Sequence, residues 1–268
     1  MLRQLLGVVG VSSFLVAAPL SVAGAADMNM PLKAPLAPPP PVYTWTGCYI
    51  SGGGGYALWN QDYSIQSTIT GVGTTTSTGG GRGWMGVFGG GCDYQFSLGS
   101  LGNWTIGAFG DYDPMDIEGT NQPQTAIVGA LGSISGSEKE SNAWFVGGRL
   151  GFLITPSLMT YFDGGYTQTH FNQVSFASVL GTAAFETMPG QTYSGWFLGG
   201  GTEYALNFSW VPIRGLFWRN EYRYASYNSA TVPIVSGLTG APTDVVEHVT
   251  PYVQTITSSL VWRFNWTH

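Results

Sequence analysis

The sequence predicts an all-β protein, a transmembrane eight-stranded antiparallel up-and-down β-barrel. Charged residues make up only 9% of the chain, far below the roughly 25% of a soluble domain. The chain also has 40 glycines and 14% aromatic residues. After residue 25 no apolar run reaches the roughly 18 residues that a spanning helix needs. Because only helices and closed barrels satisfy every backbone polar group in lipid, a barrel is the predicted class.

The first 43 residues are predicted to lie outside this barrel. Residues 1–25 have the order of a secretory signal peptide, with Arg3, then an apolar stretch, then Ala23-Gly24-Ala25. A short membrane anchor is the alternative, which the length of the apolar stretch disfavours. Residues 26–43 contain six prolines, which favour an extended polyproline II linker in the periplasm over a proline-rich ligand segment. The predicted barrel therefore occupies residues 44–268.

Segments rich in glycine and aromatic residues alternate with segments rich in Ser, Thr, Asn and Gly, as expected of barrel strands. The predicted strands are 45–62, 83–96, 104–117, 142–154, 158–170, 192–206, 215–228 and 249–264. The connections between them alternate in length: 63–82, 118–141, 171–191 and 229–248 are long, whereas 97–103, 155–157 and 207–214 are short. This alternation is typical of an outer-membrane barrel with long extracellular loops, short turns and both ends in the periplasm.

Charged residues in the predicted strands fall on one face. In the seventh strand, for example, Trp218 and Tyr222 alternate with Arg219, Glu221 and Arg223. The same alternation places ten charges in the lumen: Asp93, Asp111, Asp113, Arg149, Asp163, Glu203, Arg219, Glu221, Arg223 and Arg263. Eight strands leave a lumen that side chains fill, and buried opposite charges must pair. We therefore expect a salt-bridged plug, with a conducting pathway as the alternative.

Aromatic side chains are expected to collect at the two membrane interfaces. Strand direction predicts a periplasmic girdle of Trp45, Tyr94, Phe96, Trp104, Phe152, Phe217, Trp218, Trp262 and Phe264. It predicts an outer girdle of Trp59, Trp84, Tyr112, Trp144, Tyr166, Tyr224 and Tyr252. A water-soluble β-sandwich is the competing class, but its outward face would be polar.

Three further features bear on function. Cys48 and Cys92 would lie opposite each other if the first two strands pair around residue 70, so a disulfide is a hypothesis that export permits. His170, His248 and His268 are scattered, and loop-edge polar roles are favoured over haem or metal ligation. The acidic chain, with a net charge of −6, argues against nucleic acid as a partner. No catalytic residues, metal site or cofactor are predicted.

The N-terminal region carries a family resemblance. Pro31-Leu-Lys-Ala-Pro35, the proline run and Tyr43-Thr-Trp-Thr-Gly-Cys-Tyr-Ile-Ser-Gly-Gly-Gly-Gly-Tyr56 resemble the start of small porin-family outer-membrane β-barrel proteins. These are the major surface-antigen type of Gram-negative bacteria, with an OmpA-like barrel. Cys48 stands where the family usually has Phe. The family's closing strand ends on an aromatic assembly signal, which the resemblance assigns to Phe264 or Trp266.

The expected function is that of an integral protein of the cell outer membrane, not an enzyme, with a structural or surface-interaction role through four extracellular loops. Its expected partners are outer-membrane lipid and lipopolysaccharide, the barrel-assembly machinery and a surface ligand. The alternatives are a narrow porin-like channel for small solutes or ions and a surface haemin-binding protein.

Overall fold

The computed structural model describes residues 44–122, 134–178, 186–207 and 215–264. The predicted signal peptide and proline-rich linker, together with Trp266 and His268, lie outside the described residues. No helix in the described ranges has the length and hydropathy to cross a membrane. The described strands are β1 (Gly47–Ser67), β2 (Ser77–Ser97), β3 (Asn103–Asn121), β4 (Ile134–Thr155), β5 (Leu158–Phe171), β6 (Val174–Ser178), β7 (Glu186–Met188), β8 (Gln191–Ala205), β9 (Leu216–Tyr227), β10 (Ala230–Ser236) and β11 (Pro242–Phe264), and a short 3-10 turn (Gly99–Leu101) joins β2 to β3.

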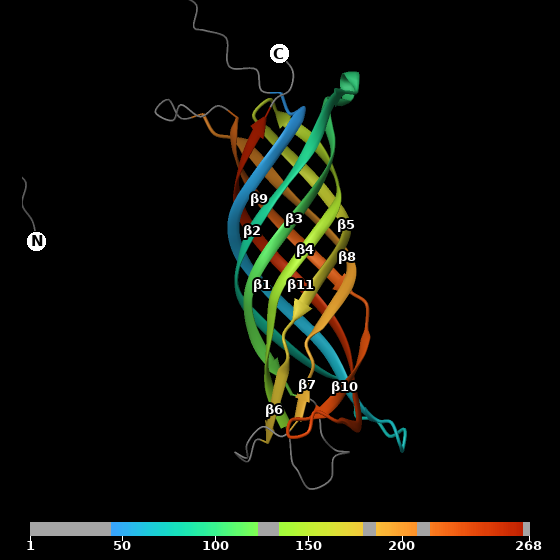
Figure 1. The fold of residues 1–268 in the computed structure, drawn as a ribbon. Helices are drawn as coiled ribbons and strands as arrows, with labels where there is room; N and C mark the ends of the chain where they lie inside the picture. The colour runs from blue at the N-terminus through green and yellow to red at the C-terminus, as the bar shows by residue number, and fades with distance from the viewer. Residues whose placement is uncertain (1–43, 123–133, 179–185, 208–214, 265–268) are drawn as a thin grey trace, which may run out of the picture. The chain divides into compact units, whose positions relative to one another are not determined.

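Eight of these strands form a closed antiparallel ring in the order β1-β2-β3-β4-β5-β8-β9-β11, with β11 pairing back onto β1 (Figure 1). The prediction of an eight-stranded up-and-down barrel is confirmed. We call the end where β1 begins and β11 ends the inner end, and the opposite end the outer end. An even number of strands, with the first beginning and the last ending on the inner side, corresponds to a barrel whose inner end faces the periplasm.

Three short strands that the sequence did not predict complete the wall at the outer end (Figure 1). There β4 pairs with β6, β6 with β7, β7 with β10 and β10 with β11. Only residues 172–173 separate β5 from β6, 189–190 separate β7 from β8, and 228–229 separate β9 from β10. The outer ring β1-β2-β3-β4-β6-β7-β10-β11 therefore also has eight strands, and three of the barrel's eight strands are each interrupted once.

The strands extend further toward the outer end than predicted, so the long connections were predicted too long. β4 begins at Ile134 instead of residue 142, and β11 begins at Pro242 instead of residue 249. The β4 extension is rich in Ser, and both extensions carry charged residues on the outward face, because they lie beyond the lipid. They consequently lack the apolar outward face that marks a membrane strand.

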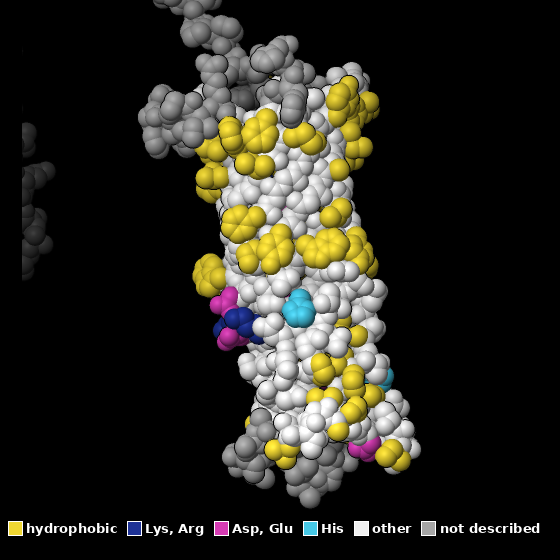
Figure 2. Space-filling model, in the orientation of Figure 1, with side chains coloured by type: hydrophobic (Ala, Val, Ile, Leu, Met, Phe, Trp, Pro, Cys, Tyr) yellow, Lys and Arg dark blue, Asp and Glu magenta, His cyan; other side chains and the backbone are white. Residues whose placement is uncertain are grey.

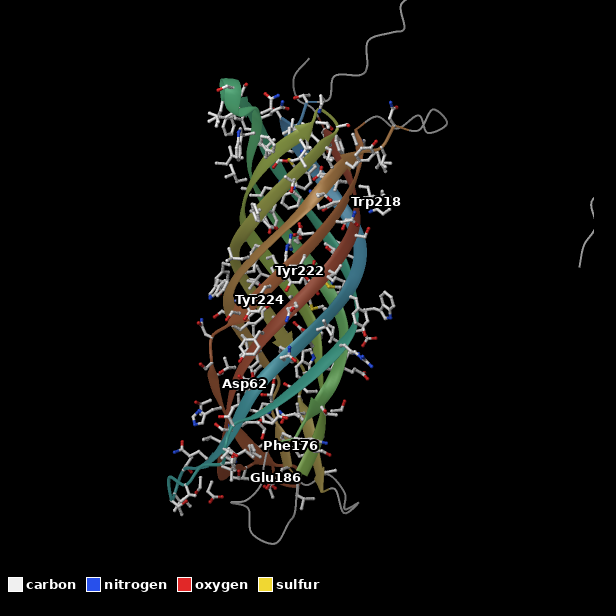
Figure 3. The ribbon with its side chains drawn as sticks, turned by 180° about the vertical axis from the view of Figure 1, so that it is seen from behind. Asp62, Phe176, Glu186, Trp218, Tyr222 and Tyr224 are labelled. Carbon is white, nitrogen blue, oxygen red and sulfur yellow. A yellow bond between two sulfur atoms is a disulfide. The ribbon has the colours of Figure 1, made fainter. Side chains whose placement is uncertain are left out.

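The outward face of the wall is apolar in the half nearer the inner end. Figure 2 shows hydrophobic side chains in two belts on the visible face, and the charged side chains of that face lie on the outer-end side of the second belt. On the opposite side, Trp218, Tyr222 and Tyr224 follow one another along β9 (Figure 3). Trp84 is 74% exposed and Tyr112 is 52% exposed. We take the segment between the two belts as the membrane-spanning part.

Three aromatic residues assigned to the girdles point inward instead. Trp45, Trp59 and Phe217 are 0%, 1% and 2% exposed, and the rings of Trp45 and Phe217 lie 4.8 Å apart. Phe217 shares its alternation with Arg219, so the pattern that places Arg219 inside also requires Phe217 inside. Trp45 precedes β1, and Trp59 lies in the glycine-rich β1, where the period-2 signal is weak.

The glycine run of β1 allows a close approach to β11 where the barrel closes. A Cβ atom at Gly53 would lie 2.2 Å from the Ser258 carbonyl oxygen, and one at Gly55 would lie 2.2 Å from that of Ile256. No side chain fits at these distances. A Cβ at Gly52, on the outward face, would meet nothing nearer than 3.9 Å, so the requirement is specific to the inward glycines.

Candidate functional site

The structure places all ten predicted lumen charges inside the barrel, where each is buried. They come from β2, β3, β4, β5, β8, β9 and β11. Each follows the inward half of its strand's alternation, because a strand that shows lipid one face must turn its charges to the other. The structure brings them together in two layers, and Asp113 lies beside the second.

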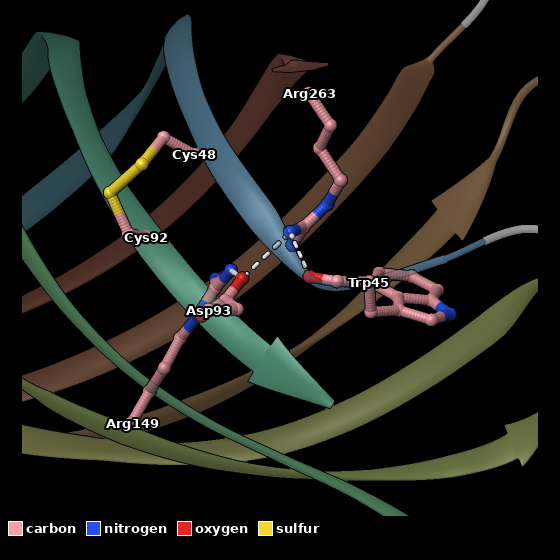
Figure 4. The surroundings of a disulfide bond; sticks show 6 residues. All are labelled: Trp45, Cys48, Cys92, Asp93, Arg149 and Arg263. Atoms are coloured by element: carbon pink, nitrogen blue, oxygen red, sulfur yellow. Dashed lines mark hydrogen bonds and ion pairs between the residues drawn. A yellow bond between two sulfur atoms is a disulfide. The ribbon is translucent and has the colours of Figure 1, made fainter. Parts of the chain in front are cut away.

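The inner layer is a closed ring of ion pairs. Asp93, Arg149, Glu203 and Arg263 come from β2, β4, β8 and β11, which are every second strand of the barrel ring. Glu203 lies 3.4 Å from Arg149 and 2.7 Å from Arg263. Asp93 pairs with the same two arginines, at 2.7 Å from Arg263 and closely with Arg149 (Figure 4). Carboxylates and guanidinium groups therefore alternate around the whole cross-section.

A fifth member, Arg219, joins this ring 3.1 Å from Glu203. Three arginines then face two carboxylates, and the Tyr49 ring accommodates the excess. The guanidinium carbons of Arg149, Arg219 and Arg263 lie 4.5, 4.7 and 5.0 Å from the centroid of that ring. Cations over an aromatic face are attracted by its quadrupole. The Tyr49 ring therefore offsets part of the excess positive charge of the inner layer.

In the middle layer the carboxylates outnumber the arginines. Arg223 pairs with Asp111 at 2.6 Å, Asp163 at 3.4 Å and Glu221 at 2.5 Å. The Tyr161 hydroxyl also donates to Glu221 at 2.5 Å. Here one arginine serves three carboxylates, and it spans the lumen, because β9 and β3 lie opposite each other in the ring of eight.

A third set of lumen charges lies near the outer end and was not predicted. Glu138, Glu140 and Glu247 are all 0% exposed, and they fall in segments that the sequence analysis assigned to loops. Their neighbour Lys139 points outward and pairs with Asp116. The alternation of Glu138, Lys139 and Glu140 was the signal that could have revealed an inward face there.

These three carboxylates lie beyond the outer belt, and the described residues include no lysine or arginine paired with them. Burial raises the pKa of Glu138 to about 7, against hydrogen bonds from Gln61 and Asn121 that lower it. Burial likewise raises the pKa of Glu140 and of Glu247 to about 8, and the nearby Glu138 adds to both shifts. A buried carboxylate without a counter-ion favours its neutral form.

Cys48 and Cys92 lie opposite each other in the β1–β2 pairing and are joined by a disulfide (Figure 4). The bond lies on the outward face near the inner end. Asp93, the next residue after Cys92, points into the lumen and belongs to the inner layer. The disulfide therefore joins the two strands beside the ion-pair ring.

The two described histidines do not converge. His170 of β5 has its Nδ1 atom 2.9 Å from the Thr192 hydroxyl oxygen, and the Nδ1 atom of His248 in β11 lies 2.8 Å from the Thr231 hydroxyl oxygen. In the ring, β8 and β9 lie between their strands. Within the described ranges no group of three or more His, Cys, Asp or Glu could hold a metal ion.

Comparison with known proteins assigns the chain to a family. No family model matches it. The 31 kDa outer-membrane immunogenic protein of Brucella melitensis is 30% identical over 201 residues, which cover 72% of this chain and 75% of that protein. The protein of the same description from Brucella suis matches to the same extent. The chain belongs to the family of the 31 kDa outer-membrane immunogenic proteins.

Membership of this family of outer-membrane immunogenic proteins confirms the predicted localisation in the outer membrane and the predicted surface-antigen type. Among solved structures, the outer-membrane protein OprG of Pseudomonas aeruginosa is 16% identical with a TM-score of 0.42, covering 82% of this chain and 97% of that one. The outer-membrane protease OmpT of Escherichia coli is 11% identical with a TM-score of 0.44, covering 82% and 98%.

Proposed function

We propose that this outer-membrane immunogenic protein is a non-conducting structural barrel that interacts with surface ligands through its outer end. The observation that carries the proposal is the closed ring of Asp93, Arg149, Glu203 and Arg263 across the lumen. A second layer around Arg223 lies behind it. An ion passing along the axis would have to separate both layers, and opening a buried ion pair costs several kcal/mol.

The outer end supports the second half of the proposal. Outward charged and polar side chains, among them Asp116, Glu118, Lys139 and Arg82, begin beyond the outer aromatic belt. The Brucella relatives are described as immunogenic, which fits a protein whose outer end is exposed at the cell surface. Within this proposal, lipid and lipopolysaccharide contact the aromatic belts, and Phe264, the last residue of β11, serves the assembly machinery.

Single-channel recording in planar bilayers tests the closed lumen. We expect the refolded wild-type chain to produce no steady conductance. The Arg223→Gln variant removes the one cation of the middle layer and leaves Asp111, Asp163 and Glu221 unpaired, so it should destabilise the barrel or admit a small cation current. The lipid-facing Asn220→Ala change on the same strand is the control and should behave as wild type. A steady wild-type current would favour the narrow-channel alternative.

A haemin titration tests the other alternative. Because His170 and His248 lie on separate parts of the wall, we expect no haem absorbance shift that depends on both. A shift that both His170→Ala and His248→Ala abolish would contradict this expectation and would make haemin the surface ligand.

A further inference from the structure

The outer part of the lumen contains a cluster of oxygen-bearing side chains that the plug does not use. Gln61, Asn121, Glu138 and Glu247 come from β1, β3, β4 and β11, and each is 0% exposed. The Asn121 amide donates to Glu138 at 3.3 Å and to Glu247 at 3.1 Å. The Gln61 amide donates to Glu138 at 3.3 Å. The four side chains therefore converge on one another from four strands.

The amide oxygens of this cluster are buried without a hydrogen-bond partner. Gln61 Oε1, Asn121 Oδ1 and the Oε2 atom of Glu247 have none among the described residues. The nearby hydroxyl of Tyr193 is also buried and unpartnered. Buried polar atoms are nearly always satisfied, and an unsatisfied group points to an unseen water or ion. Both amides contact the carboxylates through their NH2 groups, and a 180° turn of either amide about its last torsion would direct its unpartnered oxygen toward the carboxylates instead.

The cluster has no cationic side chain among the described residues, whereas each of the two layers below it contains at least one arginine. In the inner layer each carboxylate contacts at least two arginines. Glu138 and Glu247 pair with no lysine or arginine in the described part of the chain, and Lys139 points away to Asp116. Two buried carboxyl groups beside two unpartnered amide oxygens form an arrangement that a cation would complete, because a bound cation favours the ionised form of both carboxyl groups.

We propose that Gln61, Asn121, Glu138 and Glu247 form a calcium site in the outer lumen. Ca²⁺ takes six to eight oxygen ligands, including carboxylates, amide carbonyls and waters, in flexible geometry. The two carboxyl groups, which release their protons when the ion binds, balance its charge, and two amide carbonyls add neutral oxygens. The site has no nitrogen or sulfur ligand, which disfavours zinc and copper. Mg²⁺ demands near-ideal octahedral geometry, whereas four side chains from four strands offer an irregular shell.

Calorimetric titration of Ca²⁺ into the full refolded chain tests the site. We expect one binding event with a Kd on the order of 10⁻⁴ to 10⁻³ M, as in extracellular calcium modules, and at least tenfold weaker binding of Mg²⁺. Calcium should also raise the temperature at which the folded gel band is lost, compared with chelator. Absence of calcium binding would overturn the proposal in favour of protonated carboxylates, and equal binding of Na⁺ and Mg²⁺ would overturn it in favour of a non-selective cation site.

Matched variants locate the binding. Glu138→Gln with Glu247→Gln removes two buried charges at nearly constant volume and should weaken calcium binding at least tenfold. Asp116→Asn with Glu118→Gln removes two charges from the exposed outer wall nearby and should change it less than twofold. Gln61→Leu, which leaves the charge unchanged, should weaken it severalfold. Wild-type affinity in the first variant, or equal loss in the control, would contradict the site. Bilayer conductance is a separate measurement, so this proposal can fail without the closed lumen failing.

Discussion

Glu203 illustrates what individual residues contribute to this barrel. Its carboxylate contacts Arg149, Arg219 and Arg263, and it is 0% exposed. A buried pair of this kind is weak evidence for net stability, because desolvation offsets the attraction. Removing one partner is strongly destabilising, because the remaining charges stay buried without compensation. The exposed pair between Lys139 and Asp116 lacks that asymmetry and contributes little.

The Glu203→Gln variant tests this difference. It leaves three arginines with only Asp93 to neutralise them, so we expect a loss of about 3–5 kcal/mol in the free energy of unfolding. Urea unfolding of the protein in lipid vesicles measures it. The neighbouring Thr202→Val change on the lipid face is the control, expected within about 0.5 kcal/mol of wild type. A loss for Glu203→Gln no larger than for the control would rule out the ion-pair ring as a structural element.

The placement of these residues followed from the sequence only where a strand was recognised. Period-2 alternation predicted ten inward charges, and all ten are buried. The sequence did not predict the inward orientation of Glu138, Glu140 and Glu247, because their segments lack an apolar outward face and were interpreted as loops. Trp59 was wrongly assigned to the outer girdle, because in the glycine-rich β1 few side chains distinguish the two faces of the strand. The candidate calcium site combines Glu138 and Glu247 with Gln61 of the glycine-rich β1 and with Asn121, which also lies in a segment predicted as a loop, so sequence reasoning alone could not assemble it.

Among the strands, the β1–β2 hairpin is the most constrained, since it combines continuous pairing from Gly47 to Tyr63 with the disulfide between Cys48 and Cys92. The core of each of the eight strands was predictable, because lipid exposure imposes a strict alternation there. The interruptions before β6, after β7 and before β10 could not be predicted from the sequence, because they depend on which strands pair in the folded barrel. Pro189 and Gly190, which separate β7 from β8, are nonetheless residues that weaken a strand.

The double variant Cys48→Ser with Cys92→Ser tests the role of the disulfide. Its sequence separation is 44 residues, and cross-linking a loop of this order stabilises a protein by about 2–4 kcal/mol, chiefly by constraining the unfolded chain. We expect the variant to fold into a barrel that migrates as a compact band, with a lower urea midpoint than the oxidised wild type. Reduced wild type should match the variant. Equal midpoints for oxidised wild type and variant would contradict a stabilising role.

Across the whole molecule, charge is distributed unevenly along the barrel axis. The buried charged groups in the described ranges comprise four arginines and nine carboxylates. Three of the arginines belong to the inner layer and one to the middle layer. The outer lumen has carboxylates alone. This gradient was hidden from the sequence, because it requires knowing the height at which each strand places its residues.

The orientation of the barrel can be read from its two lysines. Lys139 lies on the outward wall near the outer end, whereas Lys33 belongs to the predicted periplasmic linker. We expect a membrane-impermeant amine reagent applied to intact cells to label Lys139 and not Lys33, as mass spectrometry of tryptic peptides would show. Lysed cells provide the control, in which both lysines should react. Labelling of Lys33 alone in intact cells would show that the barrel has the opposite orientation in the membrane.

The second ring of eight strands at the outer end determines what a neighbouring cell or an antibody meets there. Because β6, β7 and β10 continue the wall above the lipid, the described part of that surface is a collar of paired strands whose side chains are contributed by segments distant in sequence. A binder that recognises the collar would respond to a shape that heating destroys, and short linear peptides cut from this region would be poor substitutes for it.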